Sequence, residues 1–145
     1  MEKPDSKIIK FIQKHHVLTL ATTSGNSPWC SNCFYAYEED ENVLIFTSDP
    51  ETRHIKEASQ NPQVAGSIVL ETEIIGKIQG VQFTGHLQVP SDISGKYKTA
   101  YLKRFPYAII GSSPLWVLEL VYIKFTDNLL GFGKKLIWEK HKTLK

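Results

Sequence analysis

The fold of this chain is decided by residues 44–62, with the sequence LIFTSDPETRHIKEASQNP. Its beginning is an apolar and aromatic run that suits a pleated strand ending at Phe46. Asp49 can cap a helix N-terminus and Pro50 fits the first helical position, so a helix is predicted to start there. It is predicted to end near Gln60, because the proline at the end of the stretch disfavours helical geometry in the residue before it.

The predicted helix carries positive charge where the helix dipole favours negative charge. Its first two turns hold Arg53, His54 and Lys56. Cations at this end are explained if an anion binds there, held by free backbone amides and a guanidinium. Neighbouring hydroxyls for the same anion come from Thr47, Ser48 and Thr52. The stretch therefore predicts a phosphate site at the start of the helix.

A simpler interpretation of the same residues stays open. Short basic clusters are common on solvated helices, and Glu51 and Glu57 offset the cations here. On this interpretation the segment is an exposed helix without a ligand.

Length and composition predict one domain that covers residues 1–145. The hydrophobic content is 41% and the net charge is +2, which is too small to argue for a nucleic-acid partner. No apolar run approaches the roughly 20 residues that span a bilayer, and the N-terminus lacks a signal-peptide pattern. Two cysteines cannot make a secreted disulfide framework. We expect a cytoplasmic protein with no membrane partner.

The rest of the chain is predominantly β-like. A short amphipathic helix is predicted from Ser6 to His15, and a second helix is predicted to run from Ser91 to Phe105 before Pro106. Gly80 and Gly85 are expected bulge or close-approach sites. Regularly spaced strands with few helices indicate a closed barrel. The predicted strands are residues 17–23, 29–37, 43–46, 64–70, 78–89, 115–125 and 129–138, the last broken by two glycines.

Four stretches carry a resemblance to a known family. Thr52-Arg53-His54, followed by Asn61-Pro62 and a strand, resembles the phosphate-binding segment of the FMN-binding split-barrel superfamily, which includes the pyridoxamine 5′-phosphate oxidases. Residues 80–85, 103–106 and 123–135 resemble the uncharacterised YhbP-like family within it. The resemblance implies a mainly β split barrel with a few short helices, bound FMN, and a homodimer with the cofactor site at the interface. His54 stands where the family pattern has lysine.

The resemblance also implies residues that contact the flavin. A strand lies beside the isoalloxazine ring in the family, and here it holds Trp29, Cys30, Ser31 and Asn32. A half-buried strand without a ligand is the alternative for it. Further contacts are expected from Gln79, Gln82, Phe132 and Lys135. The substrate-binding arginine-histidine motif of the oxidases has no counterpart, so pyridoxamine phosphate oxidase activity is not expected and no catalytic residue is assigned.

Other candidate sites are weaker. Cys30 and Cys33 have a Cys-x-x-Cys spacing, but residues three apart on a strand point to opposite faces. No second cysteine pair or histidine spacing indicates a metal site. His15, His16 and His86 are isolated histidines, and a lone histidine could ligate haem, as in relatives of this fold.

These observations leave three functional hypotheses. The first is a flavin-dependent oxidoreductase of unknown substrate, in which FMN carries the redox chemistry. The second is a non-catalytic protein that holds flavin or haem. The third is a barrel that binds some other phosphate ligand.

Overall fold

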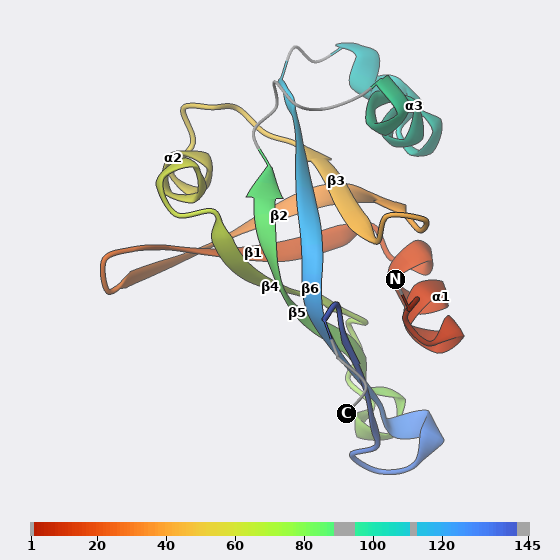
Figure 1. The fold of residues 1–145 in the computed structure, drawn as a ribbon. Helices are drawn as coiled ribbons and strands as arrows, with labels where there is room; N and C mark the ends of the chain where they lie inside the picture. The colour runs from red at the N-terminus through yellow and green to blue at the C-terminus, as the bar shows by residue number, and fades with distance from the viewer. Residues whose placement is uncertain (1, 89–94, 111–112, 142–145) are drawn as a thin grey trace.

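The computed structural model describes residues 2–88, 95–110 and 113–141. Seven strands form one antiparallel sheet in the order β3-β2-β1-β4-β5-β6-β7 (Figure 1). A further pairing of β3 with β6 closes the first six strands of that order into a barrel, and β7 extends from β6. The prediction of a mainly β split barrel is confirmed. The strands span Val17–Ser24 (β1), Ser27–Glu38 (β2), Val43–Thr47 (β3), Gln63–Val69 (β4), Gln79–Gln88 (β5), Leu115–Asp127 (β6) and Lys135–Glu139 (β7).

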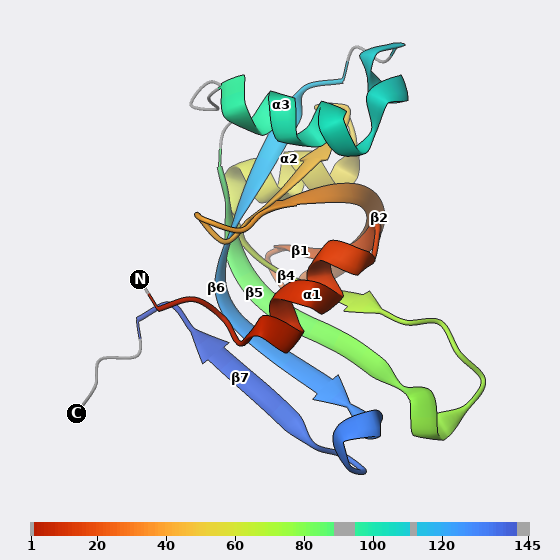
Figure 2. The same ribbon diagram turned by 90° about the vertical axis from the view of Figure 1, so that its right-hand side faces the viewer.

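Within the described residues, three α-helices pack against the barrel (Figure 2). They span Ser6–Lys14 (α1), Arg53–Gln60 (α2) and Gly95–Arg104 (α3). α1 buries Ile8, Phe11 and Ile12 in the main core, and the Tyr35 hydroxyl donates to the Ile12 carbonyl at 2.6 Å. α3 covers the outer side of β2, β3 and β6 with the buried ring of Tyr101. In the described parts of the chain, no helix is both long and apolar enough to cross a bilayer.

The set of β6 side chains that points into the core shifts by one residue halfway along the strand. Thr84 pairs with Tyr122 but Gly85 pairs with Leu120, so Val121 is an extra residue on β6. One extra residue reverses the alternation of side chains. Before Val121 the strand buries Leu118 and Leu120, and after it the strand buries Ile123 and Phe125. An uninterrupted alternation from Leu120 would bury Tyr122 instead.

Gly85 lies at this irregularity because only glycine fits there. A Cβ atom on Gly85 would lie 2.4 Å from the Glu119 carbonyl oxygen, so the predicted close approach is confirmed. A Cβ on Gly80 would meet nothing closer than 3.5 Å, and no register shift occurs there.

The predicted strand at residues 129–138 is wrong in its first half. Residues 128–130 form a 3-10 turn (η4, Asn128–Leu130), and β7 starts only at Lys135. The Asp127 carboxylate accepts from the Leu129 amide at 2.9 Å, and Gly131 and Gly133 take φ values of 134° and 73°. Positive φ at both glycines turns the chain back along β6. The helix expected from Ser91 begins at Gly95 in the structure, and residues 91–94 lie outside the described residues.

The two cysteines lie on opposite faces of strand β2. Cys33 is buried with Tyr35 on the inner face, and Cys30 is exposed on the outer face. Burial raises the pKa of the Cys33 thiol to about 11. The expectation that the two cysteines face opposite sides of the strand is confirmed.

The facing of the cysteines predicts one reactive thiol per folded chain. Thiolate is the reactive form, so an exposed Cys30 reacts with an aromatic disulfide reagent while Cys33 stays inert until the protein unfolds. Cys33→Ala should lower the free energy of unfolding by about 1 kcal/mol, and Cys30→Ser should leave it nearly unchanged. Two fast thiols in the native protein would contradict the burial of Cys33.

Replacing Gly66 on β4 is predicted to lower the stability of the fold. A Cβ atom there would lie 2.3 Å from Cζ of Phe83 and 2.4 Å from the Thr19 carbonyl oxygen. Because a core ring and a backbone atom must both shift, Gly66→Ala should cost about 1–3 kcal/mol of unfolding free energy in urea titrations. Gly76→Ala is the matched control, since a Cβ on Gly76 meets nothing within 4 Å. Equal stabilities of the two variants would show that Phe83 does not pack over β4.

Candidate functional site

The segment after β3 is anchored by two other elements. Thr47 pairs with Leu115 of β6, and its hydroxyl lies 3.2 Å from the Tyr101 hydroxyl of α3. The Ser48 carbonyl accepts from the Trp116 indole at 2.9 Å. These contacts place the start of α2 beside the closed part of the barrel (Figure 1).

Helix α2 begins three residues later than the sequence indicated. The Asp49 carboxylate accepts from the Glu51 amide at 2.8 Å, and the Asp49 carbonyl accepts from the Thr52 amide at 3.1 Å. Asp49 therefore closes a turn before the helix instead of capping it. Thr52 occupies the N-cap position without a side-chain capping bond, because its hydroxyl donates to the Asp49 carbonyl.

The first turn of α2 presents free backbone donors. The Lys56 amide donates to the Thr52 carbonyl at 3.0 Å and so begins the helical ladder. Helix geometry leaves the preceding amides, those of Arg53, His54 and Ile55, without intrahelical acceptors. Such amides, at the positive end of the helix dipole, bind anions.

Arg53 extends from this turn over the indole of Trp29. Its guanidinium carbon lies 4.2 Å from the ring centroid, and its Nε donates to Glu57 Oε1 at 2.8 Å. Within the described residues, no acceptor bonds to the two terminal nitrogens of Arg53, and 48% of the side chain is exposed. The guanidinium is thus oriented and still able to bind an anion at its outer edge.

His54 contributes hydrogen bonds rather than charge. Its Nε2 lies 2.6 Å from the Ser48 hydroxyl and 3.4 Å from the Thr52 hydroxyl. Burial lowers its pKa below the ordinary value of 6.5, so the ring is neutral at pH 7. His54 therefore does not restore the charge of the lysine in the family pattern.

The remaining charges near α2 are largely paired. Arg53 lies against Glu57, and Lys56 lies 3.1 Å from Glu51. Attraction for an anion therefore depends on the terminal nitrogens of Arg53 and the helix amides, rather than on a net positive field.

The residues expected beside the flavin ring divide between the two faces of β2. Trp29 and Ser31 lie on the inner face, and the buried Ser31 hydroxyl has no partner in the described structure. Cys30 and Asn32 lie on the outer face, where Asn32 accepts from the Thr19 hydroxyl at 2.9 Å. A flat ring on one face of the strand meets the side chains of one pair only.

The outer face carries a shallow groove of about 390 Å³. Its floor is made of small side chains, among them Ala21 and Ser67, and it is bordered by Gln82 and Lys124. Gln82 and Cys30 thus both line this groove. A second groove of about 420 Å³ continues along the same face past His86.

Three predicted residues lie at the opposite end of the molecule from α2. Gln79 begins β5, Lys135 begins β7, and Phe132 lies in the turn between β6 and β7 and is 84% exposed. Figure 1 shows this turn at the foot of the barrel and α2 near its top. A single chain does not bring these three residues to the Arg53 site.

Sequence reasoning missed the residues that hold Arg53. Glu57 Oε2 accepts from the Thr22 hydroxyl at 2.7 Å, and Thr22 is 1% exposed. The spacing of Arg53 and Glu57, four residues apart on a helix, could have indicated their ion pair. Nothing in the sequence indicates Thr22, because it comes from a strand 35 residues away.

Among the described residues, no group of three or more His, Cys, Asp or Glu side chains is placed to hold a metal ion. The donors near α2 are amides, hydroxyls and a guanidinium, which suit an anion.

The buried His54 predicts a pH effect on stability. A folded-state pKa below the unfolded value means that the unfolded chain binds more protons, so the contribution is complete above pH 6.5 and is lost as pH falls below it. Wild type should therefore lose more unfolding free energy between pH 7 and pH 5 than His54→Gln, whose amide can still bond Ser48. Parallel pH profiles in urea titrations would show that His54 is solvated.

Comparisons with known proteins agree with this architecture. A family model described as pyridoxamine 5′-phosphate oxidase matches residues 5–121. A UPF0306 protein of Yersinia pestis is 40% identical over 147 residues, covering 99% of this chain and 100% of that protein.

Solved structures share the fold at low sequence identity. A heme binding protein from Mycobacterium smegmatis superposes with a TM-score of 0.74 at 18% identity, over 96% of this chain and 60% of that one. A FAD-binding protein from Mesorhizobium loti superposes with a TM-score of 0.66 at 16% identity, over 84% of this chain and 94% of that one. At these identities the likeness concerns the fold alone. Together, the family model and the curated relative show that this chain belongs to the pyridoxamine 5′-phosphate oxidase-like split-barrel family, among its UPF0306 members.

Proposed function

We propose that this protein binds FMN, with the flavin phosphate at the first turn of α2. The observation that carries the proposal is the Arg53 guanidinium, which stacks on Trp29 with its terminal nitrogens unpartnered among the described residues. Arg53 belongs to the first turn of α2, whose amides have no intrahelical acceptor. A phosphate can accept from both sets of donors at once. Membership of an oxidase-like family and the likeness to a FAD-binding protein support a flavin as the ligand.

The role proposed for this chain is that of an oxidoreductase of unknown substrate. Bound FMN would supply the electron and hydride transfer. The chain's own residues would fix the phosphate and keep the ring against one face of β2. Among the described residues, the titratable acid–base groups bonded at the Arg53 site are His54, whose Nε2 is bonded to Ser48, and Glu57, whose two oxygens are bonded to Arg53 and Thr22.

A haem-binding protein is the second candidate. His86 lines the groove of about 420 Å³ on the outer face, together with the small residues Ala21 and Ala65. An imidazole beside a groove can ligate haem iron. The likeness to a heme binding protein favours this candidate, although it concerns the fold alone.

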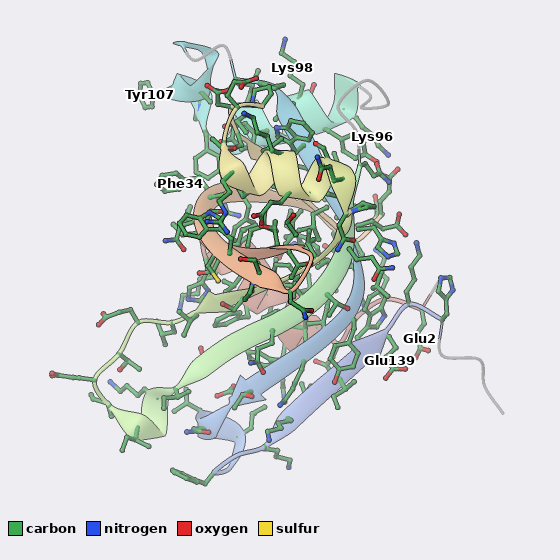
Figure 3. The ribbon with its side chains drawn as sticks, turned by 90° about the vertical axis from the view of Figure 1, so that its left-hand side faces the viewer. Glu2, Phe34, Lys96, Lys98, Tyr107 and Glu139 are labelled. Atoms are coloured by element: carbon green, nitrogen blue, oxygen red, sulfur yellow. The ribbon has the colours of Figure 1, made fainter. Side chains whose placement is uncertain are left out.

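A second copy of the chain would complete the site as the family resemblance describes it. Phe132 and Lys135 lie at the foot of the barrel, away from Arg53, so only a partner's copies could reach the flavin. Large apolar side chains remain exposed on the single chain, including Phe34 at 59% and Tyr107 at 86%, and both lie along one edge of the molecule (Figure 3). Exposed apolar surface of this kind is typical of protein interfaces. We propose an isologous homodimer in a cytoplasmic setting, with the cofactor between subunits.

One absorbance spectrum of the protein, purified without added cofactor, separates the candidates. A band near 450 nm that is bleached by a reduced nicotinamide would support the flavin-dependent oxidoreductase. The same band without bleaching indicates flavin binding without this turnover. A Soret band would favour haem, and a colourless protein that fails to take up either group would refute both candidates.

Arg53→Ala is predicted to weaken FMN binding by about 2 kcal/mol, close to 30-fold, because a charge-assisted bidentate contact is lost. Riboflavin has no phosphate, so its dissociation constant should change much less. Both constants can be measured by quenching of flavin fluorescence. Lys56→Ala is the matched control, since it removes an exposed cation of the same helix that is paired with Glu51. Equal losses for the two ligands would mean that Arg53 acts through folding.

The homodimer predicts a mass of about twice 16.5 kDa in light scattering at micromolar concentration. A stable monomer at that concentration would contradict the shared site. It would leave the Arg53 phosphate site untouched, because that site is built within one chain.

A further inference from the structure

The carboxylate of Glu57 binds the Arg53 side chain and is itself bound by Thr22 of strand β1. Its Oε1 accepts from Arg53 Nε at 2.8 Å and its Oε2 accepts from the Thr22 hydroxyl at 2.7 Å. Only 10% of the Glu57 side chain is exposed. Both carboxylate oxygens are therefore engaged, and the acid has one defined orientation.

The support for Arg53 comes from two cross-strand neighbours. Thr22 on β1 pairs directly with Trp29 on β2. Thr22 holds Glu57 through its hydroxyl, and Trp29 lies under the guanidinium with its ring. The cross-strand pair Thr22 and Trp29 thus fixes both the position and the orientation of the Arg53 side chain.

This arrangement decides which edge of the guanidinium is available. Nε is used by Glu57, so the two terminal nitrogens form the remaining edge, and that edge matches two oxygens of a phosphate. We propose that Glu57, supported by Thr22, is a positioning residue that orients Arg53 for bidentate contact with the phosphate of the bound ligand. The inference rests on the proposed function, since it assumes an anionic ligand at this site.

By its charge alone, the Glu57 carboxylate would weaken the binding of an anion at this site. The hydrogen bonds from Arg53 and Thr22 lower the pKa of Glu57, so it is ionised at neutral pH. If only charge mattered, removing this acid would tighten phosphate binding. If orientation matters more, removing it weakens binding. The two accounts therefore predict opposite signs.

The test compares Glu57→Gln with Glu57→Met in the full chain. The Gln carbonyl can still accept from Arg53 Nε and its amide can donate to Thr22, whereas Met keeps the length of the side chain and makes neither bond. Dissociation constants for FMN and riboflavin are measured for each variant by fluorescence quenching. We expect Glu57→Met to weaken FMN binding about tenfold with riboflavin nearly unchanged, and Glu57→Gln to bind FMN as wild type or more tightly.

Thr22 offers a second, independent pair of variants. Thr22→Val removes the hydroxyl at nearly constant volume, and Thr22→Ser keeps it. The Val variant should lose part of the FMN affinity and the Ser variant should recover it. Tighter FMN binding by Glu57→Met, or equal losses for FMN and riboflavin in every variant, would overturn the proposal.

A ligand-free readout separates this inference from the proposed function. The chain has two arginines, Arg53 and Arg104, so their Nε–Hε signals can be assigned in a nitrogen-correlated NMR spectrum with Arg53→Lys. The Arg53 signal should exchange slowly with water in wild type and Glu57→Gln, and rapidly in Glu57→Met. Rapid exchange in wild type would refute the positioning role. Slow exchange in a protein that binds neither FMN nor inorganic phosphate would refute the phosphate site and with it the proposed function, while the Arg53–Glu57 contact would stand.

Discussion

The pairing of β3 with β6 is the constraint on which the rest of the molecule depends. Five residues of β3, from Val43 to Thr47, pair with Leu115–Glu119 and close the barrel. The same contact brings Trp116 to the Ser48 carbonyl and Tyr101 to Thr47. The start of α2 is therefore positioned by barrel closure, and a ligand bound there would lie beside the closing pair of strands.

Much of this fold follows from local patterns in the sequence. β-rich segments separated by turn residues predicted the positions of β1 to β5, and Pro62 predicted the end of α2 near Gln60. The features of β6 and β7 that the sequence did not predict have physical causes outside the local pattern. The extra residue Val121 becomes evident only from the pairing of β6 with β5, and the turn before β7 depends on an Asp127 capping bond and on two glycines with positive φ.

The candidate site was likewise predicted only in part from the sequence. Residues close in sequence, Ser48, Thr52, Arg53 and His54, do lie together at the start of α2. Their partners could not be read from the sequence, because Trp29 and Thr22 reach the site through strand register. The alternation of side chains along β2 separates Trp29 from Cys30, and the turn before β7 places Phe132 at the far end of the barrel (Figure 1). The pairing of Arg53 with Glu57 agrees with the offset of charges expected from the sequence, whereas the neutral state of His54 follows from its burial in the fold.

The central claim is that the first turn of α2 binds the ligand phosphate through its free amides and Arg53. Residue-resolved amide hydrogen exchange with FMN and with riboflavin tests it most directly. The account predicts that FMN slows exchange of the Arg53, His54 and Ile55 amides, which have no intrahelical acceptor, while riboflavin leaves them fast. Protection of these amides by both ligands alike, or protection by FMN elsewhere with this turn unchanged, would contradict it.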